Sequence, residues 1–145
     1  MKLIVILTLV AITCYSQEQA NRKEVADAVL NYVDAFYFGD TAKIHQSISP
    51  DVVKYGYFKK KNTIDYTGEP MSFREMISYA SRVKIRGASP KVMEFPKEIQ
   101  VFDVLDQTAS ARLKAWWGID YILLAKQQGE WKITHVLWQS TPSGD

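Results

Sequence analysis

The spacing of apolar residues divides the chain into a helical first part and an extended second part. From Arg22 to Phe38, apolar residues recur at steps of three and four positions, which predicts an amphipathic helix with a broad apolar face. Gly39 is a natural end for that helix, and Asp40 is expected to cap a second, short helix that ends at Pro50. The first part of the chain is therefore predicted to hold two consecutive helices.

Extended segments and one further helix are predicted in the rest of the chain. Residues 52–58 (VVKYGYF) predict a strand, and residues 63–68 predict a second strand after a lysine-rich turn. Ser72 with Glu75 three positions later has the spacing of a capping box, which predicts a third helix. Four strand-like runs follow Pro90: residues 98–105, 108–117, 119–127 and 130–138. Helices followed by an antiparallel meander predict an α+β fold, in which three N-terminal helices cover a strongly curved sheet and form a cone around a cavity.

The last predicted strand determines which side chains should enter that cavity. Strict alternation puts Trp131, Ile133, His135 and Leu137 on one face and Lys132, Thr134, Val136 and Trp138 on the other. Lys132 and Thr134 suit solvent, so the first face is expected to be concave and His135 to lie inside an aromatic cavity. Val136 and Trp138, with Trp116 from the neighbouring strand, are then expected on the outer face. Apolar side chains on a solvent-facing sheet predict a homodimer through that face.

The first residues have the pattern of a secretory signal. Lys2 is followed by an apolar run from Leu3 to Ile12 and then by small polar residues, and the run is too short to span a bilayer comfortably. We expect cleavage after Ser16, which would leave residues 17–145 as a single exported domain, periplasmic or secreted, without membrane contact.

Composition excludes several kinds of site. Cys14 is the only cysteine, and the signal would remove it, so a disulfide framework and a cysteine nucleophile are excluded. It stands where a lipoprotein signal needs a cysteine, but Thr13 is larger than the residue that usually precedes a lipidated one, which favours the unlipidated form. A formal net charge of +2 with mixed signs provides no electrostatic basis for binding nucleic acid. His45 and His135 lack metal-ligand spacing, so neither a metal site nor a cofactor is expected.

An ordered set of residues resembles the NTF2-like superfamily. The order helix, Gly-Asp, helix, Pro-Asp, strand precedes a sheet that ends in Gly-x-Trp-Lys-Ile. The matching residues are Tyr32, Gly39, Asp40, Ile44, Pro50 and Asp51 near the start, and Asp120, Tyr121, Leu123, Lys126, Gly129, Trp131, Lys132, Ile133 and Trp138 near the end. Within the superfamily the chain looks closest to the small bacterial proteins called putative lumazine-binding, or SnoaL-like. The resemblance implies the cone described above, a cavity open at one end and frequent dimers through the outer sheet face, but no particular reaction.

The superfamily includes the ketosteroid isomerases, which use a tyrosine, a carboxylate base and a neutral carboxylic acid. Tyr32 matches the position of the tyrosine. The base would fall at or beside Gly56, which cannot take a proton, and the second acid would fall near Gly118, two positions from Asp120. The missing base argues against an isomerase mechanism.

Three functions remain open from the sequence. The favoured one is a protein that binds a small apolar or aromatic molecule, with a cavity lined by Tyr32, Tyr55, Tyr57, Trp117, Tyr121, Trp131 and His135. The alternative is an isomerase or dehydratase that uses His135 and Tyr32 as acid–base groups, together with Asp120 or Asp103. The third is a dimeric interaction module whose own side chains fill the cavity. Binding is favoured because the isomerase base is missing.

Overall fold

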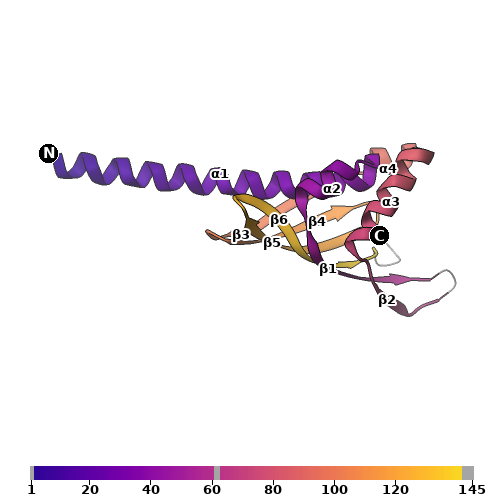
Figure 1. The fold of residues 1–145 in the computed structure, drawn as a ribbon. Coiled ribbons are helices and arrows are strands. Elements are labelled where there is room, and N and C mark those ends of the chain that lie inside the picture. Colours follow the sequence, from indigo (N-terminus) through magenta and orange to yellow (C-terminus); the bar gives the residue numbers. More distant parts are fainter. Residues whose placement is uncertain (1, 61–62, 142–145) are drawn as a thin grey trace.

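The computed structural model describes residues 2–60 and 63–141. Within these residues, four helices lie on one side of a six-stranded sheet (Figure 1). The helices are α1 (Lys2–Phe38), α2 (Thr41–Ser47), α3 (Phe73–Arg86) and α4 (Pro90–Glu94). The strands are β1 (Ile48–Lys59), β2 (Tyr66–Pro70), β3 (Glu98–Val104), β4 (Thr108–Ala115), β5 (Gly118–Gln127) and β6 (Glu130–Gln139). Residues 61–62 of the predicted lysine-rich turn lie outside the described residues.

The sheet is mixed, with strand order β2-β1-β6-β5-β4-β3. Only the β1–β6 pair is parallel among the described strands, and the other neighbours are antiparallel. Strands β3 to β6 form the predicted meander, and the helices cover one face of the curved sheet. The predicted α+β fold is therefore confirmed.

The predicted helix caps are also confirmed. Oδ1 of Asp40 accepts hydrogen bonds from the backbone N–H groups of Ala42 at 3.0 Å and Lys43 at 3.4 Å. At the start of α3, Oε2 of Glu75 accepts from the backbone N–H of Ser72 at 2.7 Å, and Ser72 Oγ accepts from the backbone N–H of Glu75 at 3.3 Å. These contacts satisfy N–H groups that a helix start leaves without partners.

Two of the predicted helix boundaries differ from the structure. Helix α2 ends at Ser47 and β1 already begins at Ile48, so Pro50 lies within a strand. Helix α1 begins at Lys2 and its first part extends away from the sheet (Figure 1). In the part of the chain that the structure describes, no helix is long and apolar enough to cross a membrane.

The core lies between α1 and the inner face of the sheet, which is the face covered by the helices. Val25, Val29 and Val33 of α1 are fully buried there. They belong to the same cluster of buried residues as Leu113 of β4, Ile122 and Leu124 of β5, and Ile133 of β6. Burial of this apolar surface is the main favourable contribution to folding, at about 25 cal/mol per Å².

Strand β6 contains a bulge that makes the predicted orientation of His135 wrong. The register of β6 against β5 shifts at Thr134, which is an extra residue on β6. Because side chains alternate along a strand, one extra residue moves every later side chain to the other face. Ile133 and Val136 are consequently both buried, and His135 is exposed on the outer face.

The predicted outer-face positions of Val136, Trp138 and Trp116 are also wrong, the first two because of the same bulge. Val136 is buried in the core, and Trp138 packs against the core from the inner face. Trp116 lies in the turn between β4 and β5, where it contacts the ring of Trp117. None of these three residues therefore lies on the outer face of the sheet.

Candidate functional site

A buried polar network connects α1, β1 and β5. The hydroxyl of Tyr32 donates a hydrogen bond to Oδ2 of Asp120 at 2.7 Å, and Nζ of Lys54 donates to the Tyr32 hydroxyl at 2.6 Å. The indole Nε1–H of Trp117 donates to the second oxygen, Oδ1, of Asp120 at 2.7 Å. Tyr32 and Asp120 are 0% exposed and Lys54 is 7% exposed. Each buried polar group in the network therefore has a partner, as stability requires.

Each element positions its residue for a local reason. Tyr32 lies on the apolar stripe of α1 that faces the sheet, one turn before Phe36. Asp120 occupies an inward position of β5, in alternation with the exposed Tyr121. Lys54 occupies an inward position of β1, between outward-facing neighbours. The helix and the two strands thus bring three polar groups to one place in the core.

Burial affects the pKa values of all three groups. It raises the pKa of Asp120, against the opposing effects of the Lys54 charge and the hydrogen bonds from Tyr32 and Trp117. It lowers the pKa of Lys54, although the charge of Asp120 acts in the other direction. Burial, together with the nearby Asp120 carboxylate, raises the pKa of Tyr32, so its hydroxyl stays protonated at neutral pH. These directions bring the charged and neutral forms of Lys54 and of Asp120 closer in free energy than they are in water.

Lys54 extends from this network to the wall of an aromatic cavity, here called the inner pocket. Its volume is about 180 Å³, and it is lined by Phe36, Lys54, Met71, Tyr79, Trp116, Trp117 and Trp138. The ammonium nitrogen of Lys54 lies 5.0 Å from the centre of the Tyr32 ring and 4.9 Å from that of Phe36. Lys54 is thus the only basic residue among those that line this pocket.

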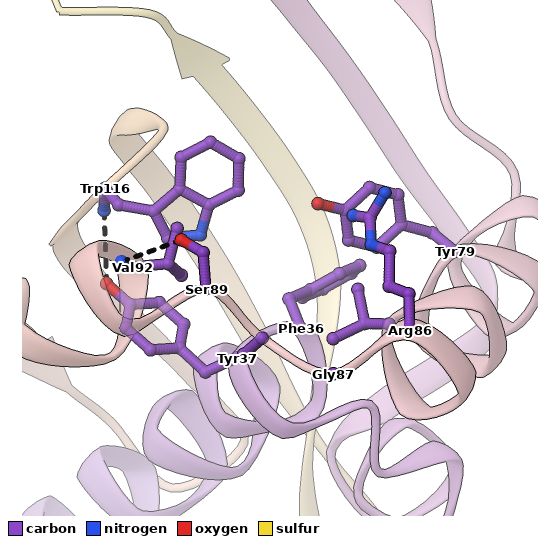
Figure 2. A pocket seen from close by; sticks show the side chains of 10 residues that line it. Phe36, Tyr37, Tyr79, Arg86, Gly87, Ser89, Val92 and Trp116 are labelled. Carbon is purple, nitrogen blue, oxygen red and sulfur yellow. Dashed lines mark hydrogen bonds between the residues drawn. The ribbon is translucent and has the colours of Figure 1, made fainter.

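A second cavity, the outer pocket, adjoins the first. Its volume is about 340 Å³ and it shares Phe36, Tyr79 and Trp116 with the inner pocket. Figure 2 shows the backbone N–H of Trp116 donating to the hydroxyl of Tyr37, at 3.2 Å, and Arg86 beside the ring of Tyr79. The shared walls place the two pockets side by side, between α3 and the β4–β5 turn.

The sequence indicated three members of the network, Tyr32, Trp117 and Asp120, but not the fourth, Lys54. Tyr32 and Asp120 were predicted as candidate site residues, and the structure brings them into direct contact. Lys54 was missed because a lysine in a strand is usually exposed. One signal could have found it. Lys54 has the same strand parity as Gly56, the position at which the isomerase base would fall, so the two residues share a face.

The structure also explains why Gly56 is a glycine. Gly56 pairs with Trp138 across the parallel β1–β6 ladder. A Cβ atom at position 56 would overlap the indole ring of Trp138. An aspartate at this position would therefore collide with the tryptophan, whose ring fills the space beside the inner pocket.

Of the other predicted site residues, Trp117 belongs to this network and the rest lie elsewhere. Trp117 contacts Asp120 directly, whereas Trp131 is buried at the opposite end of β6 from Trp138. Tyr55, Tyr57, Tyr121 and His135 all lie on the outer face. His135 and Tyr32 are therefore on opposite faces of the sheet, and the predicted acid–base pair of these two residues is wrong.

Two further residues considered from the sequence are also remote from the inner pocket. Asp103 is exposed and lines a pocket on the outer face together with His135. His45 is exposed, as expected, and its ring lies 5.4 Å from that of Phe73. Among the described residues, no group of three or more His, Cys, Asp or Glu side chains could hold a metal ion.

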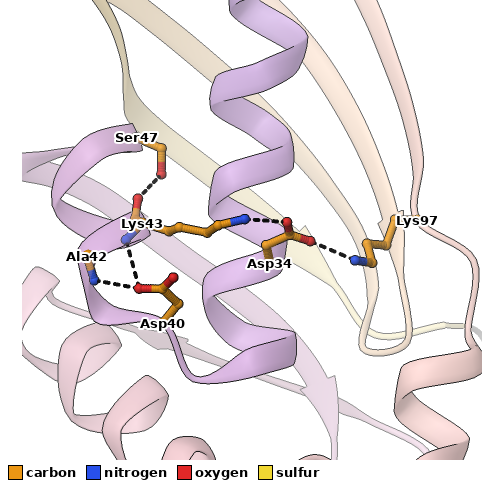
Figure 3. Close-up of polar contacts among 6 residues, drawn as sticks. All are labelled: Asp34, Asp40, Ala42, Lys43, Ser47 and Lys97. Carbon is orange, nitrogen blue, oxygen red and sulfur yellow. Dashed lines mark hydrogen bonds and ion pairs between the residues drawn. The ribbon is translucent and has the colours of Figure 1, made fainter.

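A second buried acid, Asp34, has a structural role. Its two oxygens accept from Nζ of Lys43 and of Lys97, each at 2.6 Å (Figure 3). Burial would raise the pKa of Asp34, but the hydrogen bonds and charges of the two lysines outweigh it and lower that pKa. The contacts connect α1 to α2 and to the segment before β3. Asp34 is not among the residues that line the inner pocket.

Comparison with known proteins identifies the family. The putative lumazine-binding family matches residues 20–139. The chain belongs to this family. No curated protein matches the sequence.

Solved structures of similar proteins share the fold at low sequence identity. An NTF2-like protein of unknown function from Shewanella baltica OS155 is 18% identical, with a TM-score of 0.67, and the match covers 89% of this chain and 98% of that one. An NTF2-like protein of unknown function from Silicibacter pomeroyi DSS-3 is 15% identical, with a TM-score of 0.61, over 88% and 98% of the two chains. An NTF2-like protein from Novosphingobium aromaticivorans is 11% identical, with a TM-score of 0.62, over 94% and 92%. These likenesses establish an NTF2-like fold for this chain.

Proposed function

We propose that this member of the family is an exported protein that binds a small aromatic molecule in the inner pocket. The observation that carries the proposal is an aromatic cavity with a single buried amine, Lys54, in its wall. Small-molecule sites are typically apolar cavities with a few polar groups that fix the orientation of the ligand. Lys54 would donate a hydrogen bond to a polar atom of the ligand while the aromatic walls contact its ring.

The size of the inner pocket supports a ligand with one ring. Its volume is about 180 Å³, and a dry cavity of about 150 Å³ is large enough to bind benzene. The aromatic ring of a ligand with a polar substituent would pack against Trp117 and Trp138, and the substituent would point toward Lys54. A larger ligand would extend into the outer pocket across the shared residues Phe36 and Tyr79.

Tryptophan fluorescence tests the binding proposal, because three indoles line the pocket. Toluene, benzyl alcohol and benzaldehyde would be titrated into the full chain. We expect saturable quenching by all three, and weaker binding of the two oxygen-containing compounds after Lys54→Met. Met71→Trp should fill the cavity and abolish saturable quenching.

A matched control comes from the outer face. His135→Phe alters an exposed residue remote from the inner pocket and should leave all three titrations unchanged. The same loss of quenching in His135→Phe as in Met71→Trp would contradict the proposed site, as would an unchanged titration in Met71→Trp.

Export is the second element of the proposal, and it rests on the apolar run from Leu3 to Ile12 after Lys2. The intact mass of the protein recovered from the cells that produce it tests this proposal. Recovery of a chain that begins at Gln17 supports export by the predicted cleavage. Recovery only of a chain that retains Leu3, in cells from which the periplasm has been removed, contradicts it.

We also propose that two copies associate through the outer face of the sheet. Tyr55, Leu137 and Tyr121 are register partners on β1, β6 and β5, and all three side chains are exposed. Val53 and Leu123 lie in the adjacent row, on either side of His135. A continuous apolar patch over three strands favours burial, and a second copy supplies a surface of the same kind about a two-fold axis.

A further inference from the structure

Lys54 differs from Lys43 and Lys97 in how its amine is held. Lys43 and Lys97 each contact a carboxylate oxygen of Asp34 directly, at 2.6 Å. The amine of Lys54 instead donates to the Tyr32 hydroxyl, and Asp120 accepts from that hydroxyl in turn. Lys54 therefore lines an apolar pocket, and the counter-charge of its amine lies one hydroxyl group away.

We propose that Lys54 is a nucleophile that forms a reversible imine with an aromatic aldehyde or ketone bound in the inner pocket. The inference rests on the proposed function, since it concerns the same pocket and specifies the class of ligand. An amine acts as a nucleophile only when it is neutral, and burial in an apolar pocket is a recognised way to activate lysine for this chemistry.

The hydrogen-bond chain supplies a route for the proton that Lys54 must lose. As an ammonium proton moves from Nζ onto the Tyr32 oxygen, the Tyr32 hydroxyl proton moves to Oδ2 of Asp120. Both steps follow hydrogen bonds that are already in place, at 2.6 and 2.7 Å. The result is a neutral amine and a neutral carboxylic acid, a pair that the lowered pKa of Lys54 and the raised pKa of Asp120 bring closer in free energy to the ion pair than it is in water.

The reaction balances without a co-reactant. The lone pair of Nζ attacks the carbonyl carbon, a C–N bond forms, and a proton moves from nitrogen to the former carbonyl oxygen. The proton stored on Asp120 returns through Tyr32 to the hydroxyl of this carbinolamine, which leaves as water while the nitrogen lone pair forms the C=N bond. The product is a protonated imine opposite the Asp120 carboxylate, so the pocket has the same net charge before and after.

Reductive trapping tests the proposal. The full chain would be incubated with benzaldehyde and sodium cyanoborohydride, and its intact mass and tryptic peptides would be measured. We expect one benzyl group per chain on the peptide that contains Lys54, formed at aldehyde concentrations that saturate the fluorescence quenching. Labelling spread over many lysines, with no preference for Lys54, would overturn the proposal.

Variants distinguish a nucleophile from a residue that only shapes the pocket. Lys54→Arg keeps a charged donor toward Tyr32 but cannot form the imine, so trapping at this peptide should disappear. Lys132→Met, the matched control, should leave trapping at Lys54 unchanged. Tyr32→Phe interrupts the proton route and should slow trapping by at least about tenfold, as expected for loss of a general acid–base group.

The two proposals fail in different ways. Saturable quenching by toluene and benzyl alcohol without trapping of benzaldehyde would overturn the imine and leave the aromatic pocket as a binding site. If none of the three compounds gives saturable quenching, both proposals are overturned. Circular dichroism and thermal melting of Lys54→Arg establish whether a loss of trapping reflects a loss of folding. If Lys54→Arg does not fold, the trapping rate of Tyr32→Phe decides the outcome instead.

Discussion

The hydroxyl of Tyr32 lies 2.7 Å from Oδ2 of Asp120, although the two residues are 88 positions apart in the sequence. The contact joins the first helix to the middle of the sheet inside the core. It also connects Lys54 to its counter-charge, because Nζ of Lys54 donates to the same hydroxyl. Stability and chemistry in this protein are therefore expected to depend on the same three side chains.

Asp120→Asn should destabilise the fold by about 3 kcal/mol, since removing one partner of a buried pair leaves an uncompensated charge on Lys54. Urea unfolding followed by circular dichroism measures the change. Asp103→Asn, an exposed acid on β3, should change the free energy of unfolding by less than about 0.5 kcal/mol.

A double variant tests whether the cost comes from the unpaired charge. Lys54→Met combined with Asp120→Asn should be more stable than Asp120→Asn alone, because no charge then remains in the core. Additive destabilisation by the two substitutions would show that Lys54 and Asp120 do not compensate each other.

Asp34 should make the free energy of unfolding depend on acidic pH. The pKa of Asp34 is lowered in the folded chain, and an unfolded aspartate has a pKa of about 3.9. The stabilisation is therefore present above about pH 4 and is lost as the pH falls through the folded pKa. Unfolding of the full chain in urea at several pH values should show this loss.

The matching variant is Asp34→Asn, which should cost about 2 kcal/mol at neutral pH. The cost is smaller than for a fully buried pair because Lys43 and Lys97 are partly exposed and keep part of their hydration. Its free energy of unfolding should fall less steeply below about pH 4 than that of the unaltered chain. Asp65→Asn, which alters an exposed acid, should reproduce the unaltered pH profile, and the same flattening in both variants would argue against the Asp34 contacts.

Gly56→Ala should lower stability by about 1–3 kcal/mol, the usual cost of forcing an extra methyl group into a packed core. The added Cβ would overlap the indole of Trp138. Thermal melting measures the change, and Trp138→Leu should reduce the cost of Gly56→Ala because the smaller side chain leaves room for the methyl group. An equal cost in both backgrounds would show that Trp138 does not restrict position 56.

Leu137→Lys should convert the proposed dimer into a monomer. Leu137 is 50% exposed and lies between Tyr55 and Tyr121 on the outer face, so a charge at this position would be buried in the interface. Size-exclusion chromatography with light scattering measures the mass. Ile85→Lys, an exposed residue on α3, is the control that should remain dimeric, and a monomeric unaltered chain would refute the interface.

Local signals in the sequence were sufficient for the elements and the fold class. The caps at Asp40 and at Ser72 with Glu75 depend on residues within one turn of each other, so their spacing alone predicts the contact. The apolar stripe of α1 predicted the face that carries Tyr32. Only part of the candidate site could be predicted in this way. Asp120 was a candidate because it lies two positions from Gly118, where the second isomerase acid would fall, and no short-range contact in the sequence indicated it.

The tertiary structure decided which face each late side chain occupies. The extra residue at Thr134 moves His135 and Val136 to the faces opposite to those predicted, and no residue type near Thr134 indicates a bulge. Lys54 could be buried only because folding brings Tyr32 and Asp120 to it from distant parts of the chain. The sequence by itself therefore determined the helices, the strands and the NTF2-like architecture, which follow from periodicity and short-range hydrogen bonds. The site depends on long-range pairing and on charge compensation in the core, and these exist only once the sheet and α1 have packed together.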